Sequence, residues 1–185
     1  GSGAVTAGSA SAPGTGGAVA NCPSGYSSLG GGIDLALPAS MKVSALGPLF
    51  GFQYLIDRPA GMGGAPSGWS GNARNEGAAG TMKVAAVCTQ LGGVSTIVTG
   101  AFTIGAGVAA GYSAACPAGN IALGGGIDTN DVTKNALTVT TPLFGGNPQF
   151  PADRETGSYT SATGWYGIYY DTLAANAFLN YRQLL

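Results

Sequence analysis

The sequence contains one motif twice. Asn21–Asp34 reads NCPSGYSSLGGGID, and Ala115–Asp128 reads ACPAGNIALGGGID. The offset that separates these two segments also relates Gly47–Gly51 (GPLFG) to Thr141–Gly145 (TPLFG). A long internal repeat constrains the architecture before local propensities are considered, because each copy tends to fold as the same structural unit. The sequence therefore predicts two like modules in tandem.

Both copies have the pattern of β structure. Short segments rich in β-branched and aromatic residues alternate with Gly, Pro, Asn or Asp, and no window of a dozen residues has a helical period. Met41–Leu46 would suit a helical turn, but its counterpart Lys134–Val139 is strand-like, so we expect strands at both. The GGG runs at 30–32 and 124–126 predict a bulge or bend where a Cβ would clash. We predict an all-β fold of two tandem β-sandwich-like modules.

Four parts follow from these patterns: an extended N-terminal arm (1–19), module one (20–92), a linking strand (93–113) and module two (114–185). The arm is uncharged and consists mainly of tiny side chains. One interpretation is a flexible tail without fixed structure. The other is a strand that pairs with a sheet edge, either of its own chain or of the next copy. We favour the strand, because a similar segment precedes module two. The candidate assembly residues are Val5, Thr6, Ala7, Ser9 and Val19.

Composition narrows the class of protein. Charged residues make up 8% of the 185 residues and the net charge is −1, whereas ordinary domains contain roughly 25% charged residues. With 45% hydrophobic residues the chain is not of the disordered type. There is no basic cluster for nucleic acid, and no apolar run approaches the roughly 18 residues of a membrane span. We therefore expect neither nucleic acid nor a membrane span, and little charge repulsion between copies.

The three cysteines suggest one disulfide. Cys22 opens module one and Cys88 closes it, so a bond between them would staple a small module. Cys116 opens module two, but Arg182 occupies the position that matches Cys88. We expect Cys22–Cys88 to be bonded, and Cys116 to be a free, buried thiol or bonded to another copy. A disulfide favours an oxidising compartment, either outside the cell, at its surface or in the periplasm, and we expect an extracellular or cell-surface location.

No set of residues predicts catalysis. The chain has no His, which removes the commonest general base. The acidic pairs related by the repeat, Asp57 with Asp153 and Asp34 with Asp128, are expected in two separate places, with the Asp-Arg dipeptides at 57–58 and 153–154 as turns or ion pairs. The loop Asp128–Asp131 is oxygen-rich, but a solvated turn is favoured over a calcium site. We expect no catalytic residue, metal or cofactor.

Trp69 and Trp165, with Tyr166, Tyr169 and Tyr170, form the one aromatic concentration of the chain. Exposed aromatics would form a platform for sugar rings, whereas buried ones would anchor a small core. The equal spacing of Trp69 and Trp165 after Asp-Arg favours the core for the tryptophans. The candidate contact residues are Trp69, Trp165, Tyr166, Tyr169 and Tyr170.

The segments CPSGYSSLGGGI and CPAGNIALGGGI, each followed by a PLFG turn and a GW strand, with VAAVC closing the first, resemble a module of secreted bacterial surface and collagen-like proteins. The resemblance covers most of residues 20–90 and 114–185. It implies an extracellular β-sandwich with Cys22 bonded to Cys88, and no catalytic residue. The second copy departs from the pattern by lacking the closing cysteine.

Taken together, these features predict the structural subunit of an extracellular filament or surface assembly. Its partner would be further copies of itself, joined by donation of the arm Ala4–Val19 as a strand. The alternative is a secreted carbohydrate-binding or adhesion module that binds surface glycans through the aromatic strand around Trp165. A hydrolase built on Asp57 and Asp153 is the third and weakest hypothesis.

Overall fold

The computed structural model describes residues 1–37, 39–54, 64–90, 97–104, 107–129, 131–144, 147–148, 162–171 and 177–184. Within these residues the regular elements are β-strands. The described part of the chain contains no helix that is long and apolar enough to cross a membrane. The strands are, in chain order, β1 (Ser2–Val5), β2 (Gly14–Asn21), β3 (Ser27–Leu35), β4 (Met41–Leu49), β5 (Gly68–Asn75), β6 (Gly80–Thr89), β7 (Ile97–Ile104), β8 (Ala109–Ala115), β9 (Gly124–Thr129), β10 (Asn135–Phe144), β11 (Asn147–Pro148), β12 (Gly164–Asp171) and β13 (Ala177–Leu184).

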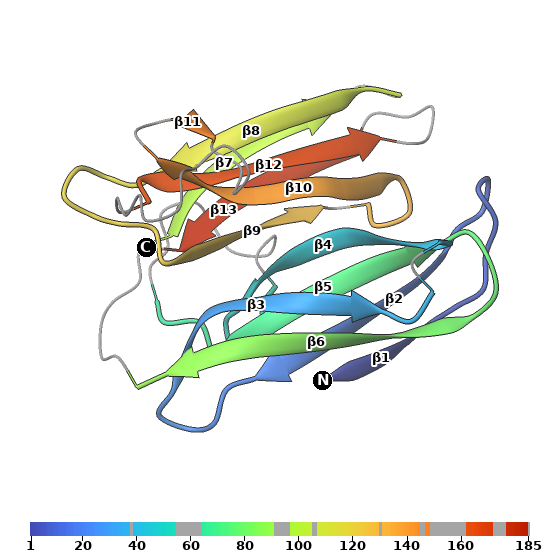
Figure 1. Ribbon diagram of the computed structural model, residues 1–185, viewed down its shortest axis with the longest axis horizontal. Coiled ribbons are helices and arrows are strands. Elements are labelled where there is room, and N and C mark those ends of the chain that lie inside the picture. Colours follow the sequence, from blue (N-terminus) through green and yellow to red (C-terminus); the bar gives the residue numbers. More distant parts are fainter. Residues whose placement is uncertain are drawn as a thin grey trace, which may run out of the picture.

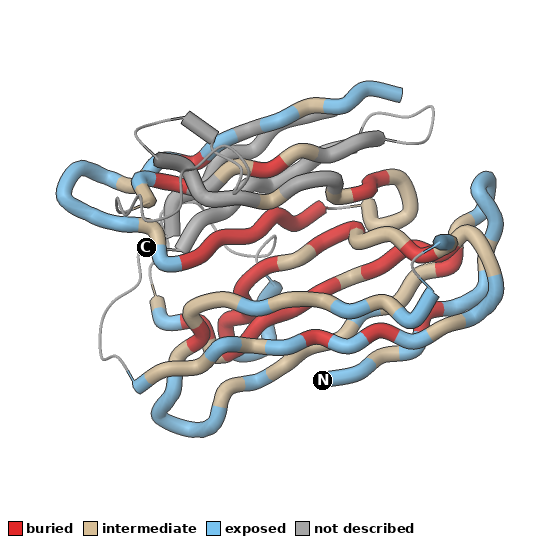
Figure 2. The backbone as a smooth tube through the Cα atoms, viewed as in Figure 1, coloured by how far each residue is buried: buried red, intermediate tan, exposed pale blue. Residues whose placement is uncertain are grey.

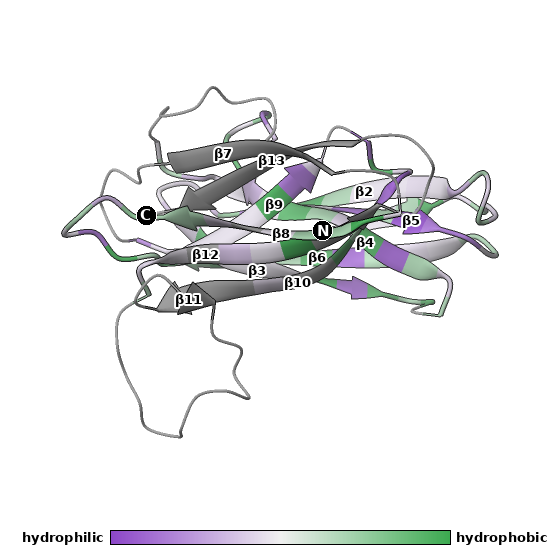
Figure 3. Cartoon of the chain, turned by 90° about the horizontal axis from the view of Figure 1, so that it is seen from above, coloured by the Kyte–Doolittle hydropathy of each residue, from purple (hydrophilic) through white to green (hydrophobic). Residues whose placement is uncertain are grey.

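These strands form three antiparallel sheets. One sheet of six strands has the order β2-β5-β4-β9-β13-β7 and therefore runs through both halves of the chain. A three-stranded sheet, β1-β6-β3, packs on its first half, and a four-stranded sheet, β11-β10-β12-β8, packs on its second half. Both smaller sheets lie on the same side of the six-stranded sheet, and the strands run roughly along the long axis of the molecule (Figures 1 and 3). The prediction of an all-β fold is confirmed.

The order of strand pairing is the same in the two halves. β1-β6-β3 in the first half matches β7-β13-β9 in the second, and β2-β5-β4 matches β8-β12-β10. The expected strand at Met41–Leu46 lies in β4, and Lys134–Val139 lies almost entirely in its counterpart β10. The segment expected as one linking strand, 93–113, contains β7 and most of β8, which pair with strands of the second half. That the halves arose by duplication stays a prediction from the sequence.

The core of the first half lies between its two sheets. Along β6, Met82 and Val84 are buried whereas Thr81, Lys83 and Ala85 are exposed, which is the period of two expected when one face of a strand is covered. The buried cluster comprises Val5, Met41, Phe50, Trp69, Ala73, Met82 and Val84. Burial continues across the joint between the halves, since every residue of β9 is buried (Figure 2).

The GGG runs differ between the two copies. In the first, the register of β3 against β6 shifts between Ser28 and Gly30, which confirms the expected bulge. A Cβ at Gly31 would overlap with the Trp69 indole and the Ala85 carbonyl oxygen, so only glycine fits there. In the second copy, Gly124–Gly126 pairs with β13 without a shift in register. The bulge is therefore absent from this second run, whereas the expected clash of a Cβ is found at Gly124 and Gly126.

The N-terminal arm forms two strands, which corrects the expectation of a single strand. β1 pairs with β6 and β2 pairs with β5, both within the same chain, and the chain turns back between them. Val5 is buried, Val19 lies in β2, and the other candidate assembly residues, Thr6, Ala7 and Ser9, are exposed in the connection. We expected the arm to pair with a sheet edge of its own chain or of the next copy. In the structure of the single chain it pairs with its own sheets.

Glycines allow the two strands of the arm to lie against each other. A Cβ at Gly3 would overlap with the Gly17 carbonyl oxygen, and one at Gly16 would overlap with that of Ala4. The backbones therefore approach more closely than side chains would permit. The small-residue composition of the arm follows from this contact, which closes one side of the first sandwich.

Candidate functional site

The acidic pairs do not form a catalytic site in the described structure. Asp34 is exposed on β3, whereas Asp128 is buried on β9 in another sheet. The candidates Asp57 and Asp153, with Arg58 and Arg154, lie outside the described residues. Among the residues that are described, no group of three His, Cys, Asp or Glu side chains is placed to hold a metal ion.

The Asp131 carboxylate stabilises the turn between β9 and β10. Its Oδ1 accepts hydrogen bonds from the backbone N–H of Thr133 (3.1 Å) and from the Thr133 hydroxyl (2.5 Å), and its Oδ2 pairs with Lys134 Nζ at 3.0 Å. Partial burial by itself would raise the pKa of this carboxyl, but the hydrogen bonds from Thr133 and the charge of Lys134 outweigh it and hold the pKa below its ordinary value. The carboxylate therefore acts as part of a turn, which is the role that the sequence favoured for this loop.

This turn belongs to a joint between the two halves. β4 pairs with β9 through Leu46 and the fully buried Ile127, which makes the six-stranded sheet continuous. A Cβ at Gly126 would overlap with the Leu46 carbonyl oxygen and the Cα of Gly47, and one at Gly124 would overlap with the Leu29 carbonyl oxygen. Glycine at positions 124 and 126 thus allows strand backbones of the first half to approach closely.

Buried polar side chains of the first half hold the β9–β10 turn. Arg74 on β5 is 1% exposed, and its Nη1 donates to the carbonyl oxygens of Thr133 (3.1 Å) and Lys134 (3.3 Å). Its Nη2 pairs with Glu76, which also pairs with Lys42 at 3.2 Å. The counter-charge of Glu76 offsets part of the cost of burying a guanidinium.

A second polar contact lies beside Arg74. The hydroxyl of the buried Ser44 donates to the Val132 carbonyl oxygen at 2.8 Å. Sequence reasoning missed both Arg74 and Ser44. The available signal was weak: Arg74 is one of only seven basic residues, and it is placed in a strand whose neighbours are small.

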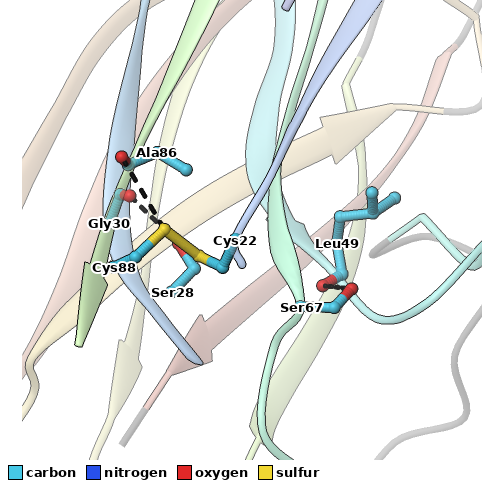
Figure 4. The surroundings of a disulfide bond; sticks show 7 residues. All are labelled: Cys22, Ser28, Gly30, Leu49, Ser67, Ala86 and Cys88. Atoms are coloured by element: carbon cyan, nitrogen blue, oxygen red, sulfur yellow. Dashed lines mark hydrogen bonds between the residues drawn. A yellow bond between two sulfur atoms is a disulfide. The ribbon is translucent and has the colours of Figure 1, made fainter. Parts of the chain in front are cut away.

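The disulfide closes one end of the first half. Cys22, directly after β2, is bonded to Cys88 on β6, which confirms the expected pairing and links the two facing sheets (Figure 4). Nearby, the Ser28 hydroxyl donates to the Gly30 carbonyl oxygen at 3.1 Å, across the bulge. Cys116 is not joined to either cysteine and is half-buried, so it is less buried than we expected, while a bond to another copy stays a prediction.

The aromatic candidates separate into two groups. Trp69 is 2% exposed in the core of the first half, so it is a packing residue and not part of a contact surface. Tyr166 is half-buried on β12. The side chains of Trp165, Tyr169 and Tyr170 lie outside the described part of the structure, so a glycan platform on β12 stays a prediction.

The chain matches no protein-family model, no curated protein and no solved structure. The resemblance to secreted surface and collagen-like proteins therefore rests on the sequence motifs alone.

Proposed function

We propose that this chain is a structural subunit of an extracellular filament or surface assembly, whose copies are joined by β-strand complementation. The observation that carries the proposal is the joint between β4 and β9, at which two sandwiches meet edge to edge in one sheet. Strand edges are thus the means by which the chain already connects its own halves. Backbone hydrogen bonds of this kind also join separate chains in strand-addition complexes.

Composition and covalent structure support the same proposal. A charge content of 8% and a net charge of −1 leave little electrostatic repulsion between copies. The bond between Cys22 and Cys88 is of the kind that persists in oxidising compartments, in keeping with an extracellular location.

The N-terminal arm is the element that copies would exchange. In the single chain, β1 pairs with β6 through Ala4 opposite Thr81. The arm of a neighbouring copy would make the same pairing, because an exchanged element reproduces the contacts of the closed monomer. The exchange needs no new surface, only release of the arm from its own sheets.

A pair of cysteines distinguishes exchange from self-pairing. In a Cys116→Ser background, Ala4→Cys with Thr81→Cys places two thiols at directly opposed positions of an antiparallel pair, where a disulfide is geometrically accessible. Material oxidised after assembly is expected to run as a ladder of covalently linked copies on a non-reducing denaturing gel. Material oxidised as a monomer beforehand should be unable to form filaments by electron microscopy.

The matched control is Thr81→Cys alone, which should leave assembly unchanged. A gel that shows only linked monomer from assembled material would refute arm exchange. Absence of any assembly of the parent protein, at every concentration tested, would refute the structural function itself.

A further inference from the structure

The outer face of β3 and β6 differs from its counterpart in the second half. Gly30 and Gly32 point away from the core, and a Cβ at either would meet no atom of a described residue within 4 Å. At their counterparts in the repeat, Gly124 and Gly126, a Cβ would overlap with strand backbone of the first half. Glycine inside a strand costs roughly 0.5–1 kcal/mol relative to alanine. Contacts with described residues account for that cost at 124 and 126 but not at 30 and 32.

A hollow lies on this face. It has a volume of about 480 Å³, and its lining includes Gly32, Asp34, Lys83 and Ala85. Val87, one of the most exposed apolar side chains, stands next to it at 61% exposure, opposite Gly30 in the register. The face therefore combines a depression over small residues with a protruding apolar side chain.

Two opposite side-chain charges stand at one end of the hollow, which the N-terminal ammonium of Gly1 also lines. Asp34 and Lys83 are exposed and lie directly opposite each other in the β3–β6 pairing. Neither forms an ion pair with a described residue, whereas Glu76 and Asp131 do. A pair of adjacent, opposite charges is complementary to its own copy after a two-fold rotation, since Lys83 then faces Asp34 of the other molecule.

From these observations we infer that the outer face of β3 and β6 is a contact surface for a second copy of this chain, related by a two-fold axis. The glycines let the opposing backbone approach closely, as Gly124 and Gly126 do inside the chain, and Asp34 pairs with Lys83 across the axis. A two-fold contact closes at two copies. The resulting dimer would be the unit of the proposed assembly, but it forms or fails independently of arm exchange.

The steric test is Gly32→Val. Because space is open at this position, the variant should keep the thermal stability of the parent protein, while its side chain fills the hollow that the second copy needs. Sedimentation velocity over a concentration series is expected to show the dimer of the parent weakened at least about tenfold, the effect of about 1.4 kcal/mol. Ser113→Val, which adds bulk at an exposed position of β8 in the other half, should leave the dimer unchanged.

Charge reversal tests the two-fold pairing and does not depend on how Gly32→Val folds. Asp34→Lys alone and Lys83→Asp alone each place like charges across the axis and should weaken the dimer. The double variant restores opposite charges and should recover it. Recovery of the dimer is the result expected of a contact in which the two positions face each other across the axis.

The outcomes separate this contact from the proposed function. A dimer that tolerates Gly32→Val and both single reversals overturns the contact, even where filaments persist. A parent protein that remains monomeric at all concentrations overturns it as well. A dimer that responds as expected, but forms no filament, upholds the contact and refutes the filament.

Discussion

The bond between Cys22 and Cys88 is expected to contribute a large share of the stability of the first half. It joins residues separated by 66 positions and connects the end of β2 to β6 in the facing sheet. Closing a loop of that length restricts the unfolded chain, and the loop-entropy relation gives about 4 kcal/mol at 25 °C. A small sandwich whose core holds few large side chains is sensitive to a change of this size.

The measurement is urea unfolding of Cys22→Ala with Cys88→Ala, followed by tryptophan fluorescence, to which the buried Trp69 contributes. With a denaturant slope of about 2 kcal/mol per molar urea, the midpoint should fall by about 2 M. Cys116→Ala is the matched control, because it removes a half-buried thiol but leaves the disulfide intact. We expect it to change the free energy of unfolding by less than about 1 kcal/mol.

The result that would refute the reasoning is an unchanged midpoint in the double variant. It would mean that contacts of β2 with β5, and of β3 with β6, already restrict the unfolded chain as strongly as the bond does. A lower midpoint combined with a changed slope would instead show that the compactness of the denatured state had changed.

Three further perturbations have defined outcomes. Gly31→Ala forces a Cβ into the Trp69 indole and should lower the free energy of unfolding by about 2 kcal/mol, whereas Gly30→Ala, in open space, should raise it by up to about 1 kcal/mol. Equal effects in chemical denaturation would contradict this packing. Arg74→Met removes the buried donor to the β9–β10 turn and should lower the free energy of unfolding by about 3 kcal/mol. Loosening of the joint should be visible as faster amide hydrogen exchange in the turn. The pKa of Asp131 is lowered on folding, so the carboxylate's contribution to stability is complete above the ordinary value of 3.8 and is lost as the pH falls through the folded pKa. The variant Asp131→Asn should therefore lose less stability in acid than the parent protein. An unchanged acid transition would argue against the assigned hydrogen bonds.

Patterns local in sequence account for the elements that were predicted correctly. The strand class of β4 and β10 follows from β-branched residues and their repeat partners, and burial of Trp69 follows from the need of a small core for one large anchor. The bond between Cys22 and Cys88 follows from their places at the two ends of module one. Each of these inferences needs only residue type, spacing and the repeat.

Contacts between distant segments decided the rest. The arm divides into β1 and β2 because glycines at positions such as 3 and 16 allow two backbones to touch, and composition alone does not distinguish that contact from a flexible tail. Identical GGG runs behave differently, because Gly31 lies over Trp69 while Gly126 lies against β4 of the other half. Arg74 is buried because the β9–β10 turn presents carbonyl oxygens to it and Glu76 supplies a counter-charge. Sequence alone thus determined a doubled, sparsely charged β chain, whereas the way its halves share one sheet depends on backbone proximities that a periodic pattern of side chains does not encode.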